Sequence, residues 1–140
     1  MTTTETFAEF CATADARNTI ELNIRKYTLM LCDALEHNFK SRNKGTIGGK
    51  YEAPAYKFVI ESGRKYHKII MEIPNLNRGP SRSVHAFVDK KTGEVYKPAS
   101  FKAPAKVVRY DLRLIKDREW LLENADWAGE YLYLIFNRGN

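Results

Sequence analysis

The chain has 140 residues, of which 44% are apolar and 29% charged, a composition typical of one globular domain. No apolar run is long enough to cross a membrane, and the N-terminus MTTTETF lacks the basic and apolar regions of a signal peptide. We therefore expect a soluble intracellular protein with no membrane partner, whose formal net charge of +6 suits acidic or phosphate-rich partners.

The charge is unevenly distributed along the chain. Residues 1–39 carry a net charge of −3, residues 40–118 a net charge of +12, and residues 119–140 again −3. This asymmetry predicts a basic surface on the middle of the chain. The alternative is that the lysines only keep sheet edges soluble.

The first forty residues are predicted to be helical. Thr2 and Glu5 fit a capping box, and a first helix then runs to about Arg17 with its apolar side on Phe7, Phe10, Cys11 and Ala14. The RNT sequence at residues 17–19 offers a break and a new N-cap, although one long helix remains an alternative.

A second helix is predicted to run to about residue 39. Its apolar residues recur every three or four positions, a period that places them on one stripe. We expect the stripe to pack into a core rather than to face a partner helix. Its members are Ile20, Ile24, Tyr27, Leu31, Leu35 and Phe39.

The KSRNKGTIGGK sequence at residues 40–50 reads as a connector and as a candidate phosphate-contacting loop. It lacks the GxxxxGK[ST] pattern of a nucleotide-binding P-loop, which excludes that motif.

From residue 55 the apolar period changes to two, which indicates β-strands. Proline and glycine turns separate four of them into an antiparallel meander, and a helix and a last strand follow. The expected strands cover residues 55–61, 66–73, 83–88, 94–97 and 131–136, and the helix covers residues 113–127. The predicted class is therefore α+β: N-terminal helices (residues 1–40) packed on an antiparallel β-meander of about five strands (residues 51–140), with one helix in the C-terminal half, all in one domain.

No metal, cofactor or catalytic signature is found. The three histidines, His37, His67 and His85, form no HxxxH, HxH or Cys/His cluster, so we expect satisfied core or edge histidines. Cys11 and Cys32 have apolar helical neighbours and suit packing in a reducing compartment. These observations favour a non-enzymatic protein without a cofactor.

Residues 93–112, GEVYKPASFKAPAKVVRYDL, hold the candidate nucleic-acid site. Pro98 and Pro104 restrict the backbone, so cations on this segment lose little entropy when they meet phosphate. Phe101 or Tyr110 would offer a ring to an unpaired base. The predicted phosphate contacts are Lys97, Lys102, Lys106 and Arg109. The alternative is a loop that crosses the sheet, with solvated lysines and with Phe101, Val107, Val108 and Tyr110 in the core.

A second basic cluster is possible around the hairpin ends, with ordinary solvated turns as the favoured alternative. Its members are Arg64, Lys65, Lys68, Arg78 and Arg82.

The strings FVDKKTGEVYKPASFKAPAK (residues 87–106) and ADWAGEYLY (residues 125–133) carry a resemblance. Over about residues 65–133 the chain resembles a family of small uncharacterised proteins of tailed bacteriophages. The resemblance implies a phage origin, an α+β fold and the cytoplasm of the infected host cell, and it implies no activity or site residue.

Three functions follow, in order. The first is a non-enzymatic phage accessory protein that binds nucleic acid through the basic middle segment. The second is a protein-interaction module, either a virion component or a binder of a host protein, which would use the acidic N-terminal helices or the C-terminal aromatics. The third is a small nuclease or hydrolase.

The C-terminal aromatics are expected to close the core, with a homodimer face as the alternative; they are Trp120, Trp127, Tyr131, Tyr133 and Phe136.

Overall fold

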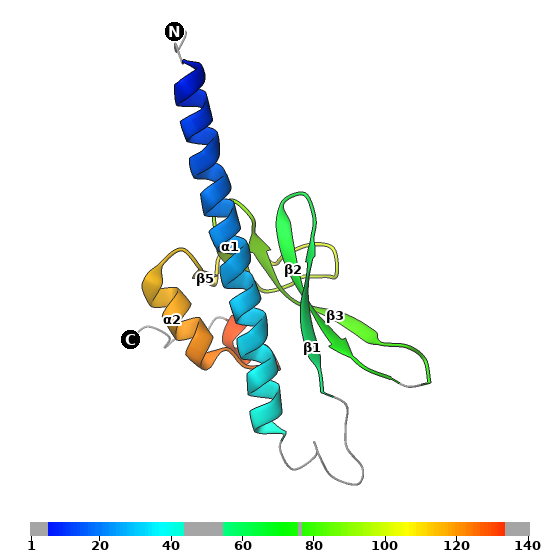
Figure 1. Cartoon of the computed structure of the whole chain (residues 1–140). Coiled ribbons are helices and arrows are strands. Elements are labelled where there is room, and N and C mark those ends of the chain that lie inside the picture. Colours follow the sequence, from blue (N-terminus) through cyan, green and yellow to red (C-terminus); the bar gives the residue numbers. More distant parts are fainter. Residues whose placement is uncertain (1–5, 44–54, 76, 134–140) are drawn as a thin grey trace.

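A long helix lies across one face of an antiparallel sheet in the computed structural model, which describes residues 6–43, 55–75 and 77–133 (Figure 1). The five strands follow one another in chain order across the sheet, β1-β2-β3-β4-β5. The elements are α1 (Phe7–Arg42), β1 (Lys57–Ser62), β2 (Tyr66–Ile73), β3 (Ser81–Asp89), β4 (Glu94–Tyr96), β5 (Tyr110–Asp111), α2 (Ile115–Asn124) and the 3₁₀ helix η1 (Glu130–Leu132). The predicted α+β class with a five-stranded antiparallel sheet is confirmed.

Helix α1 is one continuous helix, so the single long helix is the correct one of the two alternatives and no break occurs at residues 17–19. No glycine or proline lies between residues 7 and 42, and the Thr19 hydroxyl donates to the Asp15 carbonyl oxygen at 2.9 Å instead of capping a new helix. The observed capping box joins Thr6 and Glu9. The box predicted at Thr2 lies outside the described residues.

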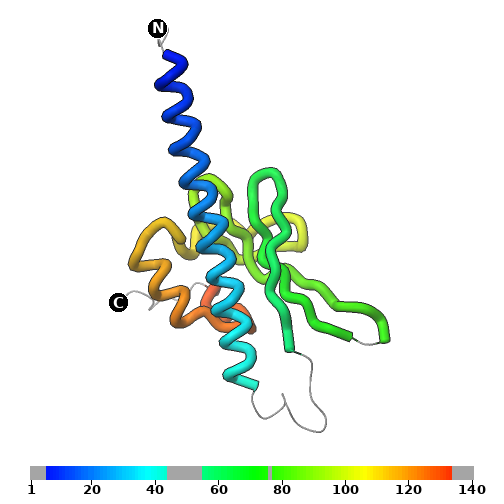
Figure 2. Tube along the Cα trace, in the orientation of Figure 1, coloured from blue at the N-terminus to red at the C-terminus, as the bar shows by residue number. Residues whose placement is uncertain are grey.

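Only the second part of α1 is packed. Its buried residues begin at Ile24 and end at Phe39, which confirms that the predicted apolar stripe forms core. The predicted apolar side of the first turns is open, because Phe7 is 82% and Phe10 is 53% exposed. Figures 1 and 2 show why: the N-terminal turns of α1 project beyond the sheet, away from the other described elements.

Every second residue of the strands points its side chain toward α1. Phe58, Ile69, Ala86 and Val95 face the helix and join its stripe in one apolar cluster. Between Ile69 and Ile70 the pairing of β2 with β3 shifts by one residue, which marks a β-bulge.

The last predicted strand is wrong over its described part. Tyr131 and Leu132 lie in η1 and are both buried, whereas a strand would turn one of them away. Asp126 fixes this turn, because its carboxylate accepts the backbone N–H groups of Glu130 and Tyr131, each at 3.1 Å. The fifth strand is instead β5, which comes from the segment predicted as an irregular basic loop.

The C-terminal aromatics divide between core and surface. Tyr131 belongs to the core and Trp127 packs against it, as expected. Trp120 is 43% and Tyr133 56% exposed. Phe136 lies outside the described residues.

Candidate nucleic-acid interface

The basic segment after β4 folds into an ordered turn. Pro98 and Pro104 form an antiparallel bridge, and the Ala105 N–H donates to the Lys97 carbonyl oxygen at 2.7 Å. At the tip, the Ser100 hydroxyl oxygen accepts the N–H groups of residues 102 and 103, each at 3.2 Å. The backbone on both sides of residue 101 is therefore fixed, which holds the tip side chains out from the turn.

Phe101 stands at this tip with an open ring. The side chain is 46% exposed, and the Lys68 ammonium lies 4.6 Å from the centroid of its ring. A cation at this distance is attracted by the ring face. The contact seats the turn against β2, on the side of the sheet that faces away from α1.

More aromatic rings and lysines continue from Phe101 along this side. Tyr66 meets Phe87 at 5.6 Å and Tyr96 at 6.2 Å between ring centroids. Lys65 lies 5.4 Å from the Tyr66 ring. The register places Lys68 opposite Phe87 and Phe87 opposite Tyr96, so these side chains share one face. We call this set the aromatic ladder: Lys65, Tyr66, Lys68, Phe87, Tyr96 and Phe101.

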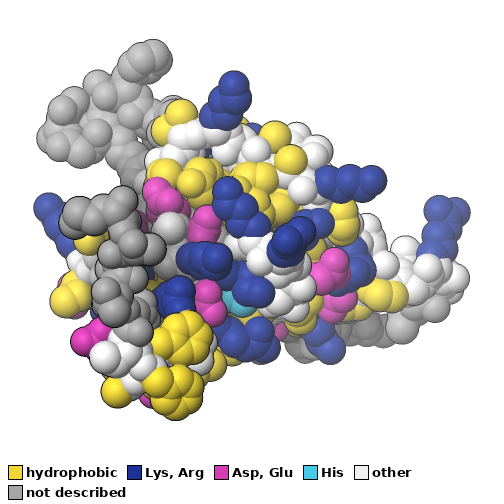
Figure 3. Space-filling model, turned by 90° about the horizontal axis from the view of Figure 1, so that it is seen from above, with side chains coloured by type: hydrophobic (Ala, Val, Ile, Leu, Met, Phe, Trp, Pro, Cys, Tyr) yellow, Lys and Arg dark blue, Asp and Glu magenta, His cyan; other side chains and the backbone are white. Residues whose placement is uncertain are grey.

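Basic residues also gather at one end of the sheet. The turns after β1 and β3 lie together, because Lys90 donates its backbone N–H to the Lys65 carbonyl oxygen at 3.0 Å and its ammonium to the Gly63 carbonyl oxygen at 3.1 Å. In the view from above, Figure 3 shows many Lys and Arg side chains on this end of the molecule. We call this region the basic end. It comprises Arg64, Lys65, Lys90 and Lys91 at the two turns, together with Arg25 of α1 beside them.

The second basic cluster predicted from the hairpin ends does not form as one group. Arg64 precedes β2 and Arg78 follows it, so the eight residues of that strand separate them. Arg82 is paired with Glu61 at 2.9 Å and with Glu72 at 3.1 Å. Its charge is therefore offset locally.

The predicted site residues of the basic segment are divided between two sides of the fold. Phe101, Lys102 and Lys106 are exposed on the turn. Lys97 points the other way, since its ammonium lies 4.8 Å from the Tyr133 ring centroid.

Arg109 and Tyr110 have structural contacts. The Arg109 guanidinium donates to the carbonyl oxygens of Leu132 at 2.6 Å, Val107 at 2.6 Å and Lys106 at 3.0 Å. Tyr110 is 4% exposed, and its ring stacks on Trp120 at 5.3 Å. Of the two rings predicted to meet a base, the fold therefore leaves Phe101 accessible and covers Tyr110.

The alternative interpretation of the segment, with its apolar residues in the core, fits Tyr110 alone. Phe101 is 46%, Val107 57% and Val108 38% exposed. The strand aromatics of the ladder, Tyr66, Phe87 and Tyr96, are not among the predicted site residues, whereas Lys65 and Lys68 belong to the second predicted basic cluster.

The thiols and histidines of the described residues are placed for packing. Both cysteines are free, and burial, with Glu36 and Asp33 nearby, raises the pKa of Cys32 to about 12. A thiol with this pKa is a poor nucleophile at neutral pH. His85 meets the Tyr131 hydroxyl at 2.8 Å, and His67 meets the Ser62 hydroxyl through Nδ1 at 2.7 Å, so each of these two buried histidines has a hydrogen-bond partner.

In the described part of the chain, no group of three or more His, Cys, Asp or Glu side chains is placed to hold a metal ion. None of the helices described is long and apolar enough to cross a membrane.

A family model, that of the family of unknown function DUF7717, matches residues 7–134. The chain belongs to DUF7717. The DUF7717 match begins at the start of α1, so it includes the helix that lies outside the sequence resemblance described above. No curated protein and no solved structure matches the chain.

Proposed function

We propose that this DUF7717 chain is a non-enzymatic nucleic-acid-binding protein of bacteriophage origin that acts in the cytoplasm of the infected host cell. The aromatic ladder and the basic turn beside it would form the interface. The observation that carries the proposal is the exposed Phe101 ring, held beside the Lys68 ammonium at the tip of an ordered turn.

An unpaired nucleic-acid strand presents the two groups that this surface suits. Base faces stack on aromatic rings with little sequence preference, and phosphates attract lysines placed along the strand. Lys65 and Lys68 lie over rings of the ladder, of which Phe101 is exposed, Tyr66 and Tyr96 are partly buried and Phe87 is buried, and Lys102 and Lys106 extend the cationic surface onto the turn. Stacking requires unpaired bases, so we propose single strands as the preferred form.

The first test is a fluorescence-anisotropy titration with single-stranded and double-stranded DNA and RNA at two salt concentrations. Replacing Phe101 by alanine should weaken single-strand binding by about five-fold to a hundred-fold, because one stacked base contributes about 1–3 kcal/mol. The control is Phe7→Ala, which removes a still more exposed ring from the projecting end of α1 and should leave binding unchanged.

Charge is tested separately. A Lys102→Glu/Lys106→Glu variant should bind more weakly and lose part of the salt dependence, because fewer counterions are released. Lys116→Glu, an exposed lysine on α2, is the charge control. Absence of binding at low salt, or equal losses in the control variants, would contradict the proposal.

A second candidate function rests on the projecting end of α1. Phe7 and Phe10 are exposed on turns that pack against nothing in the described chain, which suits an interaction with a virion or host protein or with a second copy. Light scattering over a range of concentrations, with Phe7→Ala/Phe10→Ala beside the wild type, would detect self-association. Salt dependence separates the two functions, since an apolar contact weakens little as ionic strength rises.

A further inference from the structure

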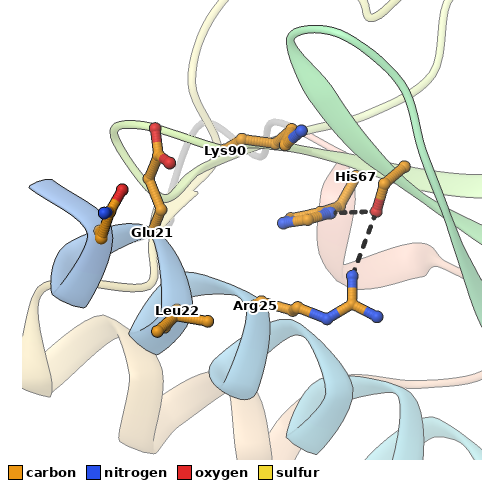
Figure 4. A pocket seen from close by; sticks show the side chains of 7 residues that line it. Glu21, Leu22, Arg25, His67 and Lys90 are labelled. Atoms are coloured by element: carbon orange, nitrogen blue, oxygen red, sulfur yellow. Dashed lines mark hydrogen bonds between the residues drawn. The ribbon is translucent and has the colours of Figure 1, made fainter.

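A pocket of about 410 Å³ lies between α1 and the basic end of the sheet. This volume falls within the range of small-molecule sites. Figure 4 shows side chains of α1 and of the sheet facing a common space. Those that carry the argument are Glu21, Leu22 and Arg25 of α1, Ser62 of β1, His67 of β2 and Lys90 of the turn after β3.

A chain of hydrogen bonds links Arg25 to His67. Arg25 donates through Nη1 to the Ser62 hydroxyl oxygen at 3.5 Å, a long contact, and that oxygen lies 2.7 Å from Nδ1 of His67. The Ser62 hydroxyl can donate its proton to Nδ1 while its oxygen accepts from Arg25. In that tautomer the imidazole proton is on Nε2, the nitrogen that points into the pocket in Figure 4.

The pocket is therefore lined by donors on one side. Nε2 of His67 has no hydrogen-bond partner among the described residues, and the Lys90 ammonium, which gives one proton to Gly63, keeps two more. Arg25 keeps the rest of its guanidinium, since the only bond recorded for it among the described residues is that to Ser62.

The charged groups around His67 are the cations Lys90 and Arg25 and the carboxylate of Glu21. Burial, followed by Lys90 and then Arg25, lowers the pKa of His67 to about 4, while Glu21 acts in the opposite direction. His67 is consequently a neutral donor at pH 7, and the positive charge belongs to Arg25 and Lys90. Glu21 lies on the α1 side of the pocket, next to the exposed Leu22 (Figure 4).

We infer that this pocket binds a phosphate monoester. The phosphate would accept hydrogen bonds from Arg25, His67 and Lys90, and the hydroxyl groups of the ester would donate to Glu21 while its carbon skeleton rests on Leu22. Donors that converge on one side suit an oxyanion, and charge-assisted bonds to phosphate are strong. A bare oxyanion would leave the acceptor side unused, whereas a hydroxylated ester uses both sides.

The inference goes beyond nucleic-acid binding by the ladder and does not depend on it. His67 faces α1, whereas its neighbours Tyr66 and Lys68 point to the opposite face of the sheet. One site can therefore exist without the other, and a variant of one leaves the other intact.

The test is an NMR titration of ¹⁵N-labelled full-length chain with inorganic phosphate, ribose 5-phosphate and ribose. Ribose 5-phosphate should shift the His67 ring nitrogens and the amide signals around Ser62 and Lys90, phosphate should do so more weakly, and ribose should have no effect. A bound dianion beside the ring should also raise the pKa of His67 above about 4.

Arg25→Met and Lys90→Met should each weaken ribose 5-phosphate binding about ten-fold or more, because each removes a charge-assisted bond. Both side chains are at least partly exposed, so the fold should persist, and unchanged amide spectra elsewhere would verify this. Lys26→Met, which removes a neighbouring exposed cation outside the pocket, should leave the affinity unchanged.

Two sources of the monoester are distinguished by oligonucleotides with and without a 5′-phosphate, added to a Phe101→Ala chain to suppress the ladder. Shifts at His67 only with the phosphorylated oligonucleotide would assign the pocket to strand ends, and saturation by ribose 5-phosphate alone would assign it to a free sugar phosphate. If none of these esters shifts His67 at millimolar concentration, or if Arg25→Met binds as tightly as the wild type, the inference is overturned.

Discussion

At the scale of single residues, Val107 stands out because its φ is +77°. This left-handed conformation is rare for a β-branched residue and costs of the order of 1–3 kcal/mol. Arg109 maintains it by donating to the carbonyl oxygens on both sides, those of Lys106 and Val107. The arginine predicted to contact phosphate therefore holds the turn that ends the basic segment.

Replacing Val107 by glycine should stabilise the fold by about 1 kcal/mol, because glycine adopts positive φ without strain, and this gain exceeds the entropy it adds to the unfolded chain. The measurement is the midpoint of urea unfolding. Val108→Gly is the matched control, since Val108 has no positive φ and the same change should be neutral or destabilising there. A lower midpoint for Val107→Gly would show that the valine side chain contributes more than its backbone strain costs.

At the scale of elements, α1 consists of two parts with different support. From Ile24 to Phe39 one face is buried in the core, whereas the turns before residue 20 rely on the Thr6 cap and on helix propensity. Helices of about 12–15 residues are marginal in water without packing. The projecting turns are therefore helical because they continue a helix whose second part is held by core packing.

Hydrogen exchange should reveal this difference. Amides of residues 7–19 should exchange at least about a hundred-fold faster than those of residues 28–39, because opening the projecting turns breaks no core contact. Measured by NMR at low protein concentration, equal protection in both parts would refute this view. Protection of residues 7–19 that appears only at high concentration would instead point to the second copy discussed above.

At the scale of the whole molecule, stability is linked to pH through buried histidines. Burial lowers the pKa of His85 to about 4, while Asp126 acts in the opposite direction. Burial raises the pKa of Tyr131 well above its ordinary value, so its hydroxyl stays protonated 2.8 Å from Nε2 of His85. In the unfolded chain the same imidazole takes up a proton near pH 6.5. Between these values the unfolded state binds more protons than the folded state, so the free energy of unfolding falls as the pH falls.

We expect His85 to contribute a loss of roughly 3 kcal/mol between pH 7 and pH 4, with full stability kept above about pH 6.5. Urea unfolding at several pH values measures it. His85→Gln keeps a polar group near Tyr131 but does not titrate, so its stability should depend less on pH over this range. His37→Gln, at an exposed position of α1, should keep the wild-type dependence. An equal slope in all three proteins would exclude His85 as the source.

Much of the fold could be predicted because it depends on the spacing of apolar residues within each helix and strand. The stripe from Ile20 to Phe39 and the alternation of residues 66–73 each bury one face of an element, and any compact arrangement must cover those faces. The 131–136 prediction failed because YLYLIF suits a strand by composition, while Gly129 with φ +83° and the Asp126 carboxylate turn the chain into η1.

The candidate site was predictable only in part. The basic segment and Phe101 were identified from composition and prolines, and their exposure agrees with that interpretation without testing it. The partners of Phe101 and the covering of Tyr110 could not be predicted, because they depend on how the turn folds back on β2 and how α2 brings Trp120 to the ring.

The helix, the antiparallel meander and the basic charge of the middle of the chain could be read from the residues alone, because they follow from apolar repeats of a few residues and from charge counts. Which cations lie together, which ring stays open, and the pocket shared by Arg25, Ser62, His67 and Lys90 depend on tertiary packing. The physical reason is distance along the chain: residues that are 37 positions apart, such as Arg25 and Ser62, meet through packing of α1 on the sheet, which no local pattern encodes.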